Sequence, residues 1–99
     1  MEAEKRQDHF RSFVGDEIGQ ALRGCQMSAR GFFYELTPLL ERSEPYGRTY
    51  MDTLELALHF KVSLHMVRRY IFELKAHNVL KEGSDGSLMC PMLIRRRFK

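Results

Sequence analysis

The chain has 99 residues, of which 43% are hydrophobic, 29% charged and 11% aromatic. This length fits one domain, and the apolar content is too high for a disordered segment. No apolar run approaches the roughly 18 residues that a transmembrane helix needs, and the polar N-terminus lacks the apolar core of a secretory signal. Cys25 and Cys90 have no CxxC partner, which excludes a disulfide framework and the standard zinc spacings. We therefore expect a small cytoplasmic globular domain.

The net charge of +3 is divided unevenly along the chain. Residues 1–60 carry seven Lys and Arg against ten Asp and Glu, whereas residues 61–99 carry nine against three. One basic face opposite an acidic or neutral face is typical of proteins that bind nucleic acids, although small proteins also acquire uneven charge by chance. The charge alone therefore leaves nucleic-acid binding open.

The first part of the chain gives mixed signals. Residues 1–9 are polar and are predicted to form a flexible leader outside the folded domain. Residues 10–14 favour a short β-strand, which the Gly15-Asp16 turn pair would end. Residues 17–24 fit a short helix by their apolar spacing, although glycines in and beside this stretch weaken that interpretation.

A clearer helix is predicted from about Ala29 to Arg42, with Ser28 as a favourable N-cap residue. Pro38 lacks an N–H and clashes with the preceding turn, so we expect a kink there or an end of the helix near Leu36. A short strand is expected after this helix, at residues 49–51. The apolar side chains that recur at helical intervals are Phe32, Phe33, Leu36, Leu39 and Leu40.

Two further helices are predicted in close succession. Asp52 and Glu55 have the spacing of a capping box, which begins a helix that ends near Phe60. A three-residue turn separates this helix from a longer one, which Ser63 caps and which ends at about Asn78, because Asn adopts the left-handed conformation that terminates helices. A single buried stripe is predicted on the longer helix, formed by Val67, Ile71 and Leu74.

The last part of the chain predicts a β-hairpin followed by a basic tail. Residues 79–81 and 88–90 are the expected strands, and Asp85-Gly86 between them is a strong hairpin turn signal. Pro91 cannot donate a hydrogen bond to a sheet, so the second strand is expected to end there. Residues 95–99 then form a basic C-terminal tail.

This order of elements is that of a winged helix-turn-helix, in which an Arg-rich second helix is followed by a hairpin. We therefore expect a mainly α (α+β) fold, with a winged-helix domain over residues 10–94 and the hairpin as its C-terminal wing. The second helix would enter the major groove of DNA, which is about 12 Å wide, while the wing and the tail contact phosphates. The predicted DNA-binding residues are Ser63, His65, Met66, Arg68 and Arg69 on the helix, Lys81 and Ser84 in the wing, and Arg95, Arg96, Arg97 and Lys99 in the tail.

Short motifs along the chain extend this interpretation. They are Phe13-Val14-Gly15-Asp16, Met27-Ser28-Ala29-Arg30-Gly31-Phe32-Phe33, and an Asp85-Gly86 wing that ends in Ile94-Arg95-Arg96. In this order, over residues 10–97, they resemble the YdaU-like domains of phage and prophage replication proteins. The resemblance implies binding of origin or template DNA in a phage or other mobile element, within the cytoplasm of a bacterial host. Two features depart from that family: Pro38 interrupts a helix that usually runs clear, and the basic tail alone follows the wing, without an ATPase or loader-binding segment.

The predicted function is sequence-specific or origin binding of double-stranded DNA, in replication initiation or transcriptional regulation. The alternative is a protein-interaction module that docks on a replication or host protein, including one that inhibits host defence. Neither function involves a membrane, and both are compatible with a homodimer.

No catalytic, cofactor or metal site is predicted. Asp16 and Glu17 are adjacent, so their side chains diverge and do not form a paired carboxylate site. The phosphate-binding pattern GxxxxGK[ST] does not occur. Neither cysteine has a His at a recognisable spacing for nucleophilic catalysis, and the histidines are not spaced as metal ligands. We therefore expect no enzyme and no cofactor.

Overall fold

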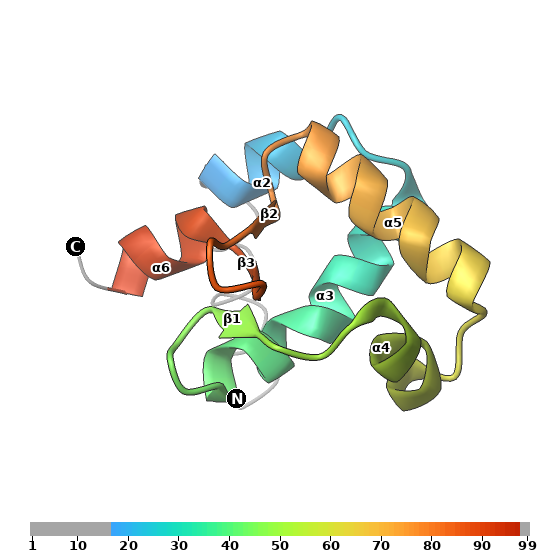
Figure 1. The fold of residues 1–99 in the computed structure, drawn as a ribbon. Coiled ribbons are helices and arrows are strands. Elements are labelled where there is room, and N and C mark those ends of the chain that lie inside the picture. Colours follow the sequence, from blue (N-terminus) through green and yellow to red (C-terminus); the bar gives the residue numbers. More distant parts are fainter. Residues whose placement is uncertain (1–16, 98–99) are drawn as a thin grey trace, which may run out of the picture.

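The computed structural model describes residues 17–97, which form five helices and three short strands (Figure 1). The mainly helical content with one small antiparallel sheet confirms the α+β class. The predictions for residues 1–16, namely the leader, the early strand and the turn, lie outside the described residues. The elements are α2 (Glu17–Leu22), α3 (Met27–Arg42), β1 (Arg48–Thr49), α4 (Thr53–Phe60), α5 (Leu64–Ala76), β2 (Lys81–Glu82), β3 (Leu88–Met89) and α6 (Pro91–Arg97).

Helix α5 packs against both α3 and α4, and its apolar stripe forms the centre of the core. Val67, Ile71 and Leu74 are 0%, 6% and 0% exposed, so the predicted buried stripe is confirmed. These side chains share one apolar core with Phe33 and Leu36 of α3. Burial of each such side chain stabilises a fold by about 1.5–3 kcal/mol, so the stripe holds α5 firmly in place.

Local hydrogen bonds satisfy the start of α4 and the start of α5. Asp52 accepts from the Glu55 N–H at 2.8 Å and Glu55 accepts from the Asp52 N–H at 3.1 Å, which confirms the predicted capping box. Lys61 ends α4 in the left-handed conformation, with a φ of 56°. The Ser63 hydroxyl accepts from the Met66 N–H at 3.2 Å and caps α5, as predicted. Because these helix ends are satisfied locally, the short turn sets the relative orientation of α4 and α5.

The sheet has β3 as its central strand, paired antiparallel with β1 on one side and β2 on the other. Leu88 lies opposite Thr49 in β1 and Glu82 in β2. Strand β1 begins at Arg48, one residue earlier than the expected strand at 49–51, and Tyr50 has already left the sheet. The predicted β-hairpin is confirmed as β2 and β3, although each strand has only two residues.

The start of α3 differs from its prediction. Gln26 is the N-cap residue, its side chain makes no capping hydrogen bond, and Ser28 lies in the first helical turn. The Gln26 N–H instead donates to the carboxylate of Glu73, which α5 brings to this end of α3. A carboxylate is stabilised at a helix N-terminus by the helix dipole. The prediction of a Ser28 cap was therefore wrong because the acceptor comes from a distant helix.

Pro38 does not end α3, which continues to Arg42. The alternative of an end near Leu36 was therefore wrong. A proline inside a helix removes one backbone hydrogen bond and costs about 3 kcal/mol. Leu36 and Leu40, on either side of Pro38, are fully buried. Ending the helix at Leu36 would withdraw Leu40 from the core, so burial offsets the cost of the proline.

The arginines after the hairpin belong to a helix that was not predicted from the sequence. Helix α6 begins at Pro91, since proline is favoured at the first helical position, and it buries Met92 and Leu93. The arginines at 95–97 form its last turn, where the helix dipole favours positive charge. The expected boundary between domain and tail thus falls inside α6, and Lys99 lies outside the described residues.

Truncation of the buried stripe tests this core. We expect Ile71→Ala to lower the free energy of unfolding by about 2–5 kcal/mol, the usual range for removing a buried branched side chain, as measured by urea denaturation. Leu58→Ala, on the exposed side of α4, is the control and should change the stability little. An Ile71→Ala variant with an unchanged unfolding midpoint would contradict the packing of α5.

The hairpin turn gives a second, local test. Gly86 has a φ of 86° and an added Cβ would meet no atom within 4 Å, so a side chain there causes backbone strain without a clash. We expect Gly86→Val to lower the stability of the hairpin by about 1–2 kcal/mol. Amide exchange should become faster in residues 81–89 while the amides of the helices stay protected. Gly31→Val, whose Cβ also enters open space but at a helical φ, is the control. Simultaneous loss of protection over the whole domain would contradict a local role for this turn.

Candidate nucleic-acid interface

One face of α5 carries exposed side chains at helical intervals, opposite the buried stripe. Residues spaced three and four apart lie on the same side of a helix, and here they surround a shallow hollow together with the half-buried Glu73. In Figure 1, α5 runs along the upper right edge of the molecule with α3 and α4 below it. This outer face of α5 consists of His65, Arg68, Arg69, Phe72 and Ala76.

The structure brings three of the five predicted helix residues together on the outer face of α5. His65, Arg68 and Arg69 are exposed there. Ser63 instead uses its hydroxyl oxygen to cap the helix, and Met66 is half-buried. Ser63 therefore positions α5, while the other three side chains are accessible to a ligand.

Arg68 and Arg69 give the outer face its positive charge. Within residues 17–97 neither guanidinium group forms an ion pair. Glu73 borders the same hollow, but its carboxylate accepts the hydrogen bond from the Gln26 N–H. Lys61 is exposed in the turn just before α5 and adds a further positive charge. The outer face is therefore a cationic surface of the described part of the chain.

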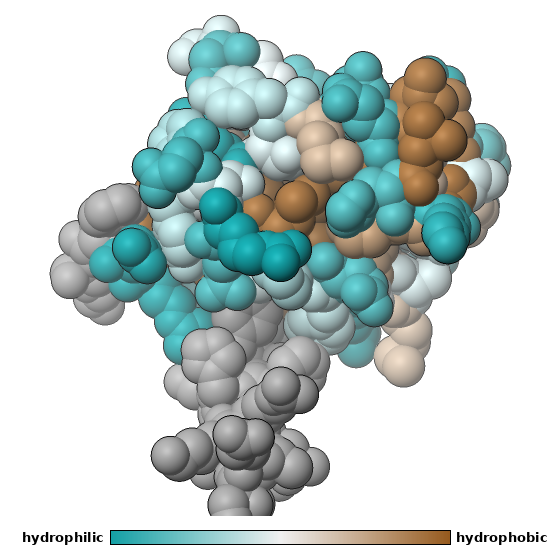
Figure 2. All heavy atoms as spheres, turned by 90° about the horizontal axis from the view of Figure 1, so that it is seen from below, coloured by the Kyte–Doolittle hydropathy of each residue, from teal (hydrophilic) through white to brown (hydrophobic). Residues whose placement is uncertain are grey.

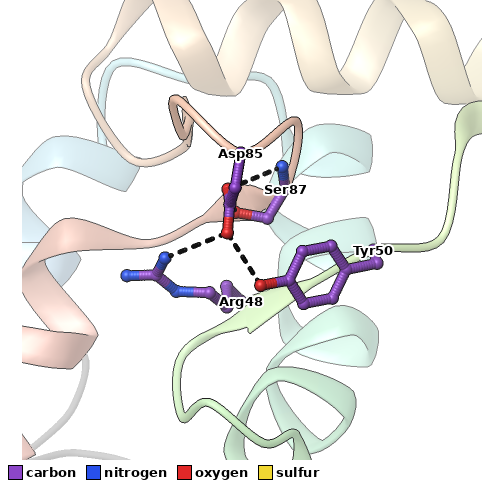
Figure 3. A network of polar contacts seen from close by, with 4 residues as sticks. All are labelled: Arg48, Tyr50, Asp85 and Ser87. Atoms are coloured by element: carbon purple, nitrogen blue, oxygen red, sulfur yellow. Dashed lines mark hydrogen bonds and ion pairs between the residues drawn. The ribbon is translucent and has the colours of Figure 1, made fainter.

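The tip of the hairpin is tied to the chain that follows β1 (Figure 3). The Asp85 carboxylate accepts hydrogen bonds from the Ser87 hydroxyl at 2.6 Å, the Tyr50 hydroxyl at 2.7 Å and the Ser87 N–H at 3.1 Å. It also lies 3.6 Å from the Arg48 guanidinium. The bond to Tyr50 and the ion pair with Arg48 connect the tip to the segment around β1.

The same hydrogen bonds shift two pKa values in opposite directions. Donation from the Ser87 hydroxyl, then from the Tyr50 hydroxyl, stabilises the carboxylate and holds the pKa of Asp85 well below its usual range. The bond to Asp85 stabilises the protonated phenol and raises the pKa of Tyr50. At neutral pH the tip therefore carries a fixed carboxylate.

The two predicted wing residues are exposed but have different surroundings. Lys81 borders a hollow between the C-terminal end of α5, β2 and α6. At the edge of this hollow, Lys75 forms an ion pair with Glu82 at 2.6 Å, whereas Lys81 forms no ion pair within residues 17–97. Ser84 lies at the tip of the hairpin beside Asp85. Lys81 is thus the wing residue with a cation available to a phosphate.

The arginines of α6 lie apart from the outer face of α5. Arg95 pairs with Glu17 at 2.5 Å, and the guanidinium of Arg97 lies 4.6 Å above the ring of Tyr46, a cation–π contact. Figure 1 shows α6 at the opposite side of the molecule from the N-terminal half of α5. Arg95 and Arg97 therefore contact Glu17 and Tyr46, away from the outer face of α5.

Phe72 is a member of the outer face that sequence reasoning missed. Its side chain is 76% exposed, the largest apolar side chain around the hollow. Its spacing of four and three residues from Arg68 and Arg69, and its place beside the buried Ile71, were the available signals. An aromatic residue is more often buried than exposed, which is why the position was not selected.

An exposed apolar pair on α4 was also missed. Leu54 and Leu58 are 54% and 71% exposed and lie one helical turn apart. Figure 2 shows apolar side chains gathered over α4, at the right of the view. This pair lies on a different helix from the cationic surface.

Comparison with known protein families, with curated proteins and with solved structures finds no match to this chain. The resemblance to YdaU-like domains therefore stays a prediction. Within residues 17–97, no three His, Cys, Asp or Glu side chains are grouped in a way that could hold a metal ion. None of the helices described has the length and apolar character required to cross a membrane.

The Asp85 contacts predict a pH dependence of the hairpin. Since the pKa of Asp85 is lowered in the folded protein, its stabilising contribution is present above the ordinary Asp value of about 3.9 and is lost as the pH falls below it. In an NMR titration, we expect its carboxyl carbon to titrate below that value in the wild type and closer to it in Tyr50→Phe. Tyr70→Phe is the control for loss of a phenol elsewhere. Equal midpoints in wild type and Tyr50→Phe would contradict the proposed contribution of this hydrogen bond.

Proposed function

We propose that this chain is a winged helix-turn-helix domain that binds double-stranded DNA through the outer face of α5. The order α3, β1, α4, α5, β2 and β3 supports this fold, since a winged helix places a helix and a strand before two turn-linked helices and a hairpin. Pairing of β1 with β3 attaches the hairpin to the helical core, as a wing requires. The capped turn between α4 and α5 is consistent with a helix-turn-helix.

The observation that carries the proposal is the contrast between the two faces of α5. One face is anchored in the core by fully or almost fully buried side chains. The other presents Arg68 and Arg69 without an ion pair in residues 17–97. A helix with its side chains is about 10–12 Å wide and fits the major groove, which is about 12 Å wide. Phosphates along the groove attract such a cationic face.

The residues of the site have distinct roles in this proposal. Arg69 donates two hydrogen bonds to a guanine edge, Arg68 holds a phosphate and His65 contacts the groove one turn earlier. Lys81 and Ser84 contact the neighbouring backbone. The arginines of α6 contribute less, because Arg95 and Arg97 already have partners in the fold. The setting is replication initiation or transcriptional regulation in a phage or mobile element.

A second candidate function is supported by the apolar pair on α4. Leu54 and Leu58 expose more than half of their side chains, and exposed apolar surface that forms a patch marks protein-interaction sites. This feature favours docking on a replication or host protein. It involves α4, so the two functions can be separated by substitutions on different helices.

Substitution of the two arginines tests the DNA proposal. Arg69→Ala should reduce the preference for a selected duplex over random DNA by about 1–3 kcal/mol, because a bidentate base contact is lost. Arg68→Ala should weaken binding to the selected duplex and to random DNA by the same factor. It should also lower the slope of log affinity against log salt by about 0.9, because one phosphate contact is lost. Duplexes selected from a random pool, measured by fluorescence anisotropy at several salt concentrations, provide the readout.

Arg42→Ala is the matched control, since it removes one exposed positive charge at the far end of α3. It should alter duplex affinity little. If neither Arg68→Ala nor Arg69→Ala changed binding to any duplex, the DNA function would be abandoned in favour of docking through α4. In that case Leu58→Ala should weaken partner binding.

A further inference from the structure

The exposed ring of Phe72 has no role in the core. It is 76% exposed, whereas the apolar stripe on the opposite side of α5 is at most 6% exposed. Phe also has a lower helix propensity than Ala or Leu. Neither packing nor helix formation therefore accounts for a phenylalanine at this position. A contact with a ligand of the outer face would account for it.

The surroundings of Phe72 restrict the chemistry of that ligand. The other side chains around the hollow are His65, Arg68, Arg69, Glu73 and Ala76, so no second large apolar side chain accompanies the ring. Protein-docking patches gather several apolar and aromatic side chains at their centre. A lone aromatic ring beside two guanidinium groups instead suits a partner that is anionic and presents an isolated small apolar group.

Thymine in duplex DNA has this combination. Its C5-methyl group projects into the major groove and is contacted by apolar side chains, Phe among them. We propose that Phe72 packs against a thymine methyl group, which makes α5 a reader of thymine near the guanine that Arg69 contacts. This inference rests on the proposed function. Phe72 lies three residues beyond Arg69, about 4.5 Å along the helix, so the thymine is expected within one or two base pairs of that guanine.

Replacement of thymine by deoxyuridine, which lacks only the methyl group, is the direct test. For the duplex selected by the wild type, we expect the thymine form to bind roughly three- to fivefold more tightly than the uracil form for each contacted methyl. Phe72→Ala should lower affinity for the thymine form by a similar factor and abolish the difference, while Phe72→Leu retains part of it. The comparison across variants cancels any effect of uracil on DNA shape.

Leu58→Ala is the matched control, because Leu58 is 71% exposed but lies on α4. It should keep the full difference between the two duplexes. Since Phe72 is exposed, Phe72→Ala should melt at the same temperature as the wild type, so a change in binding would not reflect unfolding.

The outcomes separate this inference from the function on which it rests. Failure of the wild type to bind any duplex would overturn both. Tight binding without a thymine–uracil difference, or a difference that persists in Phe72→Ala, would overturn the inference alone. Equal loss of both duplexes in Phe72→Ala would assign the ring to base stacking, and unchanged affinity for both would assign it to a protein partner; either result would overturn the methyl contact.

Discussion

Burial of the α5 stripe against α3 is the contact on which both the core and the candidate interface depend. A helix repeats every 3.6 residues, so the inward direction of Val67, Ile71 and Leu74 also fixes which side chains point outward. Rotation of α5 would move Arg68 and Arg69 towards the core, where an unpaired charge is strongly unfavourable. The packing that buries the stripe therefore also places Arg68 and Arg69 on the exposed side of α5.

The hairpin depends on a different kind of interaction. Strands of two residues provide few ladder hydrogen bonds, so the sheet alone holds β2 and β3 weakly. Asp85 adds contacts to Tyr50, Ser87 and Arg48, which join the tip to the segment around β1. Burial of Leu80 and Leu88 anchors the base of the hairpin in the core, and these polar contacts hold its tip to a segment more than 30 residues away.

Features encoded in a few neighbouring residues could be predicted from the sequence, and features that need a distant partner could not. The capping box at Asp52, the cap at Ser63 and the stripe of α5 depend on local spacing and were predicted correctly. The N-cap of α3 was not, because Glu73 supplies the acceptor from 47 residues away. The exposure of Phe72 was missed for another reason: its position off the predicted stripe was available from the sequence, but aromatic side chains are more often buried than exposed.

Glu73 connects the fold to the candidate interface with opposite effects on each. Its carboxylate accepts from the backbone N–H of Gln26, the N-cap residue of α3, yet it also borders the hollow that Arg68 and Arg69 line. A negative charge at that place opposes the approach of a phosphate. Replacement of Glu73 by a side chain that is neutral and accepts no hydrogen bond would thus raise the attraction of this face for a phosphate and remove support for α3, so the position sets anion affinity against stability.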